Sequence, residues 1–223
     1  SAFGGIVALN RELDAQLAHK LKSLFLEVII APSFTNESII ILGSKPNLRL
    51  LSTKTMPKPS EEGLFIKSIA GGMLVQTKDN HILKKGELNF VTKKIPNPKE
   101  INDLLFAWKI AKHTKSNAII YAKNLQTTGI GAGQMSRIDS TYIATNKAIA
   151  SAEIANLDKP LTVGSVVASD AFFPFPDGLI SAADAGVTAV IQPGGSMKDQ
   201  EVIAAADERN ISMIFTGIRH FKH

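Results

Sequence analysis

The stretch that decides the fold runs from Ile6 to Leu51 and reads IVALNRELDAQLAHKLKSLFLEVIIAPSFTNESIIILGSKPNLRLL. Short apolar runs in it alternate with segments whose apolar residues recur at helical spacing. The expected strands are 6–9, 28–31 and 48–51, and the expected helices are 12–26 and 36–43. A βαβαβ alternation of this kind predicts a layered α/β arrangement.

Residues 54–63 carry prolines and mixed charges and form the best linker in the sequence. The expected domains are therefore 1–60 and 61–223. Beyond the linker the expected strands are 72–77, 88–92, 118–122, 127–130, 163–168, 187–191 and 212–215, and the expected helices are 100–113, 136–155, 179–185 and 197–208. Because 118–122 and 127–130 read as a hairpin, the sheet is expected to be mixed, and the fold class is α/β.

Composition limits the function. The formal charge is only +5 and the basic residues are scattered, so nucleic acid is not the expected partner, whereas a small anion is. There is no cysteine, which is typical of a reducing cytoplasm and excludes thiolate chemistry. The apolar runs are too short to span a membrane. The chain opens at Ser1 directly in an apolar run, so we expect a fragment of a longer protein.

Two segments carry the most informative polar residues: Lys115-Ser116-Asn117, at an expected helix-to-strand junction, and the turn Gly131 to Arg137. Asn117 is either a helix C′ residue in the left-handed conformation or an amide that orients a substrate. Arg137, at the start of a helix, is either an exposed arginine or a fixed fork for a phosphate or carboxylate. The glycines here lack the third glycine of a dinucleotide fingerprint, so a nicotinamide oxidoreductase is a weak alternative.

The segment from Ser169 to Asp177 places three phenylalanines among prolines beside carboxylates. Such aromatics are either core or the wall of a pocket for a flat ring, and Asp177 is either a helix N-cap or part of that pocket. The loop Pro193 to Ser196 either meets an anion or caps the next helix, with Ser196 and Asp199 at capping-box spacing. The zinc-deaminase motif, which needs cysteine ligands, is absent.

These segments resemble the family of bifunctional purine enzymes that combine AICAR transformylase with IMP cyclohydrolase. The matching stretches are 1–5, 27–32, 115–119, 131–137, 169–175 and 215–223, in the order the family has them. The resemblance implies the C-terminal part of a transformylase with a cytidine-deaminase-like fold that lacks zinc. It also implies formyl transfer from 10-formyltetrahydrofolate to AICAR to give FAICAR, which the parent enzyme cyclises to IMP.

The resemblance also implies roles for individual residues. Asn117 would be the catalytic amide. AICAR would be held by Gln134, Arg137, Arg219 and His223, and the folate by Phe172, Pro174, Phe175 and Asp177. A potassium ion, seen in the family, would have Thr114, Ser116 and Asp170 as oxygen donors.

The family's Lys-His catalytic segment and its cyclohydrolase domain have no counterpart in these 223 residues. We therefore expect half of a transformylase site, inactive alone, in a cytoplasmic homodimer. The alternative is a non-catalytic binding or dimerisation module on the same scaffold. Binding of both AICAR and a folate would favour the enzyme, and self-association without either ligand would favour the module.

Overall fold

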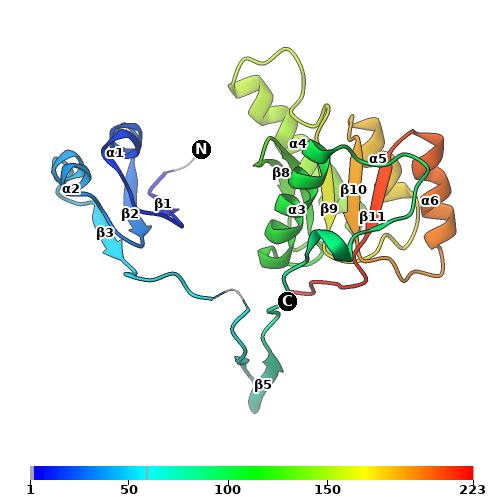
Figure 1. Ribbon diagram of the computed structural model, residues 1–223, viewed down its shortest axis with the longest axis horizontal. Coiled ribbons are helices and arrows are strands. Elements are labelled where there is room, and N and C mark those ends of the chain that lie inside the picture. Colours follow the sequence, from blue (N-terminus) through cyan, green and yellow to red (C-terminus); the bar gives the residue numbers. More distant parts are fainter. Residues whose placement is uncertain (1–2, 59, 223) are drawn as a thin grey trace. The chain divides into compact units, whose positions relative to one another are not determined.

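The computed structural model describes residues 3–58 and 60–222. The chain forms two compact units, Ser1–Asn80 and His81–His223 (Figure 1). This division falls twenty residues after the linker boundary expected at residue 60, because a hairpin that follows the linker is grouped with the first unit. The family resemblance implies that residues 1–60 are the C-terminal remnant of a first transformylase lobe and that residues 61–223 are a second, deaminase-like lobe; this assignment stays a prediction.

The first unit contains the predicted βαβαβ alternation. Its parallel sheet has the order β1-β2-β3, and the elements are β1 Gly5–Ala8, α1 Ala15–Lys22, β2 Leu26–Ala31, α2 Asn36–Leu42 and β3 Arg49–Ser52. Asp14 caps α1 by accepting the Leu17 amide at 2.8 Å, and Thr35 caps α2. α1 is shorter than predicted because this cap begins it after residue 14 and Leu26 already belongs to β2.

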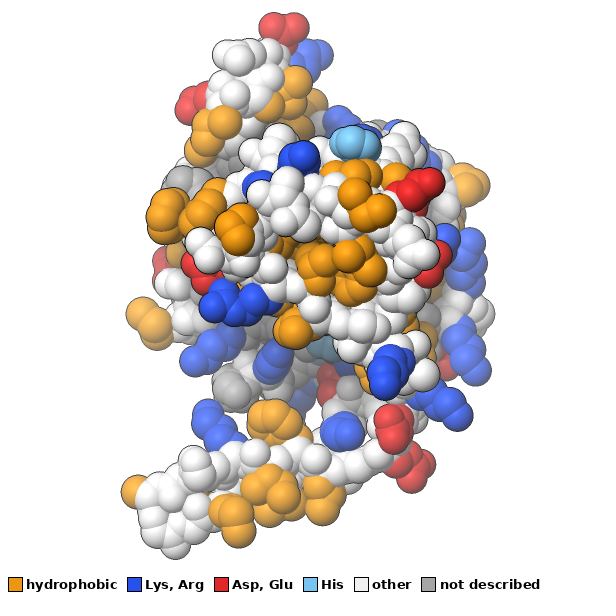
Figure 2. Space-filling view, turned by 90° about the vertical axis from the view of Figure 1, so that its left-hand side faces the viewer, with side chains coloured by type: hydrophobic (Ala, Val, Ile, Leu, Met, Phe, Trp, Pro, Cys, Tyr) orange, Lys and Arg blue, Asp and Glu red, His pale blue; other side chains and the backbone are white. Residues whose placement is uncertain are grey.

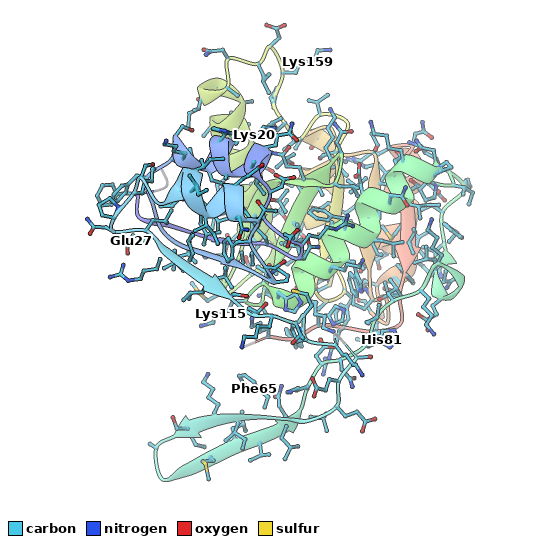
Figure 3. The ribbon with its side chains drawn as sticks, turned by 60° about the vertical axis from the view of Figure 1, so that its left-hand side comes forward. Lys20, Glu27, Phe65, His81, Lys115 and Lys159 are labelled. Carbon is cyan, nitrogen blue, oxygen red and sulfur yellow. The ribbon has the colours of Figure 1, made fainter. Side chains whose placement is uncertain are left out.

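The hairpin consists of β4 Leu64–Ile69 and β5 Gly72–Thr77, paired antiparallel. β5 agrees with the strand predicted at 72–77, whereas β4 was not predicted. Every residue of both strands is exposed, and the exposed residues include Leu64, Ile66 and Val75. Figure 3 shows Phe65 on this hairpin, and Figure 2 shows hydrophobic side chains along it.

The second unit has a six-stranded mixed sheet in the order β6-β11-β10-β9-β7-β8. Its strands are β6 Asn89–Phe90, β7 Ile119–Lys123, β8 Gln126–Gly131, β9 Val166–Ser169, β10 Ala189–Gln192 and β11 Ser212–Phe215. Its helices are η1 Lys85–Glu87, α3 Pro98–His113, α4 Arg137–Ile154, α5 Asp177–Asp184 and α6 Asp199–Glu208. The predicted mixed α/β sheet and the β7–β8 hairpin are confirmed.

Alternate residues of the central strands enter two separate cores, so helices cover both faces of the sheet. On β7, Ile119 and Tyr121 face the core under α4, α5 and α6, whereas Ile120 and Ala122 face the core under α3 (Figure 1). Burial raises the pKa of Tyr121 to about 12, an effect that its hydrogen bond with Thr145 opposes. In the described part of the chain, no helix is both long and apolar enough to cross a bilayer.

Two glycines of the Gly-rich segment allow α4 to lie directly on β8. A Cβ on Gly131 would stand 1.8 Å from the carbonyl oxygen of Ser140, and one on Gly129 would stand 2.1 Å from that of Ala144. The segment is therefore mostly strand, and its glycines permit close helix–strand contact. The third glycine of the segment, Gly133, takes a positive φ of 68°, whereas Gly129 and Gly131 do not.

Gly131→Ala should consequently destabilise the second unit strongly. Helix and strand must separate to admit the methyl group, which we expect to cost about 3 kcal/mol of unfolding free energy. Urea denaturation measures this cost. Gly86→Ala is the matched control, because a Cβ there meets nothing within 4 Å. Equal unfolding midpoints for the two variants would contradict the packing argument.

Candidate functional site

One edge of the second sheet gathers nearly all the predicted site residues. β7 runs antiparallel to both β8 and β9, and β9, β10 and β11 are parallel, so β8 to β11 all end at the edge where β7 begins. The loops at this edge are 114–118, 132–136, 170–176, 193–198 and 216–222. Ligands of open α/β sheets commonly bind at such carboxyl ends.

Arg137, the first residue of α4, is the most constrained side chain at this edge. Its Nε donates to Ser169 Oγ at 2.7 Å, and its Nη2 donates to Asn117 Oδ1 at 3.1 Å and to Asp170 Oδ1 at 2.9 Å. The side chain is only 9% exposed, so the interpretation of Arg137 as an exposed helix arginine is wrong. No described residue accepts a hydrogen bond from Nη1, which leaves two donors in fixed directions.

Asp170 is the counter-charge, and it is completely buried. Besides Arg137, its carboxylate accepts the backbone amide of Ala118 at 3.1 Å and the hydroxyl of Ser116. Three donors thus compensate the desolvation of this carboxylate. The pair joins the end of β9, the start of β7 and the start of α4.

Asn117 organises the turn before α4. Its Nδ2 donates to the carbonyl oxygens of Gln134 at 2.8 Å and Met135 at 3.1 Å, and its own carbonyl accepts Ser140 Oγ. The peptide bond between Ser116 and Asn117 is cis. Asn117 has no positive φ, so its interpretation as a left-handed C′ residue is wrong. α3 instead ends on Thr114, which is extended at φ −93° and ψ 140°.

Gln134 lies half-buried in the same turn, where its Nε2 donates to the Ala132 carbonyl at 3.0 Å. Arg219 is exposed at the same edge, and its guanidinium lies 5.0 Å from the ring centroid of Phe221. His223, the fourth residue predicted for AICAR, lies outside the described residues. The structure therefore brings Gln134, Arg137 and Arg219 to one edge and leaves their contact with a ligand as a prediction.

The aromatic segment divides between core and surface. Phe173 is 1% exposed and packs against Gly178, whereas Phe172 and Pro174 are half-buried and Phe175 is 56% exposed. The residues predicted for folate are thus the ones that the core leaves partly or fully accessible.

Two predicted caps are wrong. Asp177 is the first residue of α5 rather than its N-cap, because Pro176 holds the cap position without a side-chain hydrogen bond. Ser196 does not cap α6, which begins after Lys198; its hydroxyl accepts the Lys198 amide instead. Asp199 Oδ2 accepts the Gly195 amide at 2.7 Å, so a carboxylate already fills the position predicted for an anion.

The donors named for potassium are already engaged. Ser116 Oγ donates to Asp170 and accepts the Lys222 amide, and Thr114 Oγ1 donates to the Ile110 carbonyl at 2.8 Å. A hydroxyl that donates its proton keeps lone pairs for a cation, so these hydrogen bonds do not test the potassium site, which stays a prediction. Across residues 3–58 and 60–222, no group of three or more His, Asp or Glu residues is suited to hold a metal ion.

Sequence reasoning missed two contributors. Ser169 fixes Arg137 Nε, and Ser140 holds the Asn117 carbonyl. The pairing of strand ends that brings them together depends on sheet order, which hydropathy patterns do not give. An arginine and an aspartate 33 residues apart gave no signal that they form a buried pair.

Asp170→Asn should cost about 3 kcal/mol of unfolding free energy, because it leaves the Arg137 charge buried without its counter-charge. Asp184→Asn is the control: that side chain is 71% exposed and 3.9 Å from Arg209. Urea denaturation of both variants measures the difference. A cost for Asp170→Asn as small as for the control would mean that Asp170 does not compensate Arg137.

Comparison with known proteins gives a consistent result. A family model described as AICARFT/IMPCHase bienzyme matches residues 1–147. The chain is 60% identical over its full length to a protein of Mesorhizobium japonicum called bifunctional purine biosynthesis protein PurH, and it covers 41% of that protein. Proteins of the same name from Sinorhizobium medicae and Parvibaculum lavamentivorans are 60% and 58% identical over all 223 residues, and the chain covers 42% of each.

A solved structure described as protein ybgI, of unknown function, matches at a TM-score of 0.23 and 11% identity, covering 98% of this chain and 74% of that one, and carries no argument. The chain spans about two fifths of the length of the relatives above. With the family model matched over residues 1–147 and identity of 58–60% across its whole length, this chain belongs to the AICARFT/IMPCHase bienzyme family.

Proposed function

We propose that the edge around Arg137 is the AICAR side of a transformylase site in a longer enzyme of purine biosynthesis. The reaction would move a formyl group from 10-formyltetrahydrofolate to the amine of AICAR, giving FAICAR. The observation that carries the proposal is the Arg137 guanidinium, held on Nε and Nη2 and unpaired on Nη1 at the carboxyl edge. Membership of the bienzyme family supports the choice of substrate.

Arg137 would recognise AICAR by direction rather than by net charge. Asp170 lies 2.9 Å away and neutralises most of the guanidinium field. The two N–H groups on Nη1 nevertheless point in fixed directions, because three acceptors hold the rest of the side chain. A carbonyl or phosphate oxygen of the ligand would therefore gain hydrogen bonds without further ordering of the protein.

Asn117 would act in this site through Arg137 and the turn. Both of its N–H groups are engaged by Gln134 and Met135, and its Oδ1 accepts Arg137. The amide therefore fixes the orientation of Arg137 and of the Gln134 backbone. We assign Asn117 a positioning role, which refines the catalytic amide implied by the family resemblance.

On the folate side, Phe172, Pro174 and Phe175 would contact the pterin ring, and Asp177 would accept its N–H groups. Phe175 is exposed for stacking, and Asp177 is an exposed carboxylate at the start of α5.

Transfer forms a bond from the AICAR amine to the formyl carbon and breaks the bond from that carbon to folate nitrogen. The amine must lose a proton.

The proton acceptor is the missing part. Asp170 is committed to Arg137, and the family resemblance implies a Lys-His segment for this task. Since the chain spans about two fifths of its relatives, we propose that the 223 residues are inactive alone and that the parent enzyme is cytoplasmic and also an IMP cyclohydrolase. Formyl transfer by the purified chain, with full-length enzyme excluded, would contradict this.

Arg137→Lys tests the AICAR assignment. Lysine keeps a positive charge beside Asp170 but lacks the two Nη1 N–H donors of the guanidinium. We therefore expect AICAR affinity, measured by calorimetry, to fall about tenfold. Arg209→Lys, at the end of α6 with ion pairs of 3.9 and 4.0 Å, is the matched control and should bind like the unmodified chain. An unchanged affinity in Arg137→Lys, or no binding of AICAR to the unmodified chain, would refute the assignment.

The hairpin favours a second candidate function, a dimerisation module with a second copy as partner. One face of it carries Leu64, Ile66, Met73 and Val75, all more than half exposed. A two-stranded hairpin is marginal in water on its own, and such apolar surfaces mark interaction sites.

Ile66→Lys should therefore weaken self-association measured by sedimentation equilibrium, by about tenfold or more in dimer dissociation constant. The control is Lys67→Ala, because Lys67 lies on the opposite face of β4. A monomeric unmodified chain, or an unchanged dimer in Ile66→Lys, would exclude the hairpin as the dimer contact.

A further inference from the structure

The residues after β11 form a strap along the carboxyl edge. The amides of Thr216 and Gly217 donate to the carbonyls of Gln192 and Pro193 at 3.0 and 2.9 Å. Farther along, the His220 amide donates to the Asp170 carbonyl at 2.9 Å, and the Lys222 carbonyl accepts the Ser116 amide at 2.9 Å. Figure 1 shows this red segment running below the strands toward the C-terminus. The strap, residues 216–222, therefore passes the ends of β10 and β9 and reaches the start of β7.

The strap and Arg137 are held by the same two residues. Ser116 Oγ accepts the Lys222 amide at 3.1 Å and donates to Asp170. Asp170 accepts His220 on its backbone and Arg137 on its side chain. Displacement of the strap would thus remove a hydrogen-bond partner from Asp170, which is the Arg137 counter-charge, and one from Ser116, which donates to it.

One side chain anchors the strap. The His220 ring is 1% exposed and lies with its centroid 4.7 Å from that of Trp108, tilted by 48°. Trp108 belongs to the core under α3, and its Nε1 has no hydrogen-bond partner among the described residues, so packing alone holds the indole. The flanking Arg219 and Phe221 are exposed. The imidazole is therefore the part of the strap that is removed from water.

The burial of this ring matters because the other contacts of the strap are weak individually. Its backbone hydrogen bonds exchange with bonds to water at small net gain. Burial of an aromatic ring against another ring in the core supplies favourable free energy that contact with water does not. The neighbouring Lys222 closes the far end, where its Nζ donates to the His113 carbonyl at 3.0 Å.

We propose that His220 is a positioning residue: its ring, seated on Trp108, keeps the strap closed on Ser116 and Asp170 and thereby sets Arg137 and Arg219 for AICAR. The inference rests on the proposed function for its ligand. The proposal adds a coupling between strap closure and ligand affinity. The open form binds AICAR less well, so the apparent affinity falls as the open fraction of the protein rises.

The closure itself is tested without ligand. Trp108 is the single tryptophan of the chain, so tryptophan emission reports on its surroundings, which include the His220 ring. In His220→Ala we expect a changed emission and about tenfold faster hydrogen exchange at the amides of residues 220 and 222. His220→Phe keeps an aromatic ring on Trp108 and should restore slow exchange. His19→Ala, at an exposed histidine of α1, is the control and should change neither.

AICAR affinity is then measured at a temperature where all variants are folded. We expect the dissociation constant to rise about tenfold in His220→Ala and to recover in His220→Phe, which a loss of global stability alone would not produce. An opened strap with unchanged affinity would overturn the coupling. If AICAR fails to bind the unmodified chain, the proposed function fails, and the ligand-free exchange result still decides the anchor.

Should His220→Ala not fold, the unmodified chain answers the question. AICAR should slow hydrogen exchange at the amides of residues 220 and 222 while leaving the α1 amides unchanged, because a ligand that binds the closed form shifts the population toward it. Equal exchange at residues 220 and 222 with and without bound AICAR would overturn the proposal.

Discussion

The buried ion pair between Arg137 and Asp170 is the interaction on which the carboxyl edge depends. Burial of both charges is costly, and it is tolerated here because neighbouring groups complete the pair: Ser116 and Ala118 donate to the carboxylate, and Ser169 and Asn117 accept from the guanidinium. The pair therefore acts as a geometric lock more than as a source of stability. It fixes the end of β9, the beginning of β7 and the first turn of α4 relative to one another.

Close packing of α4 on β8 makes this lock possible. Gly129 and Gly131 remove the side chains that would hold the helix away, and α4 then starts with Arg137 directed at Ser169 and Asp170. A residue with a Cβ at position 131 would move the helix start outward. The distances of 2.7 and 2.9 Å around the guanidinium leave little room for that movement. The glycines thus serve the position of one arginine.

Local patterns predicted most of the fold and little of the site. Apolar spacing placed nearly every helix and strand, because burial of one face is encoded within each element. The strand at Leu64 to Ile69 was missed, although its partner β5, whose residues are just as exposed, was predicted. At the site, Asn117 and Arg137 were identified as important, yet two interpretations were left open for the environment of each. Those environments depend on Ser169 and Asp170, more than 30 residues away, and on the sheet order.

The site is assembled from segments that meet only after the whole second unit has folded: 115–118, 132–137, 169–177 and 216–222. Formation of the site is therefore not separable from folding of the sheet that carries it. Any ligand that contacts Arg137 selects the folded unit, and its binding free energy adds to the stability of that unit by mass action. Conversely, the carboxylate of Asp170 cannot stay buried without the guanidinium, the Ser116 hydroxyl and the Ala118 amide all in place. Stability of the second unit and readiness of its carboxyl edge for a ligand are thus two consequences of the same set of contacts.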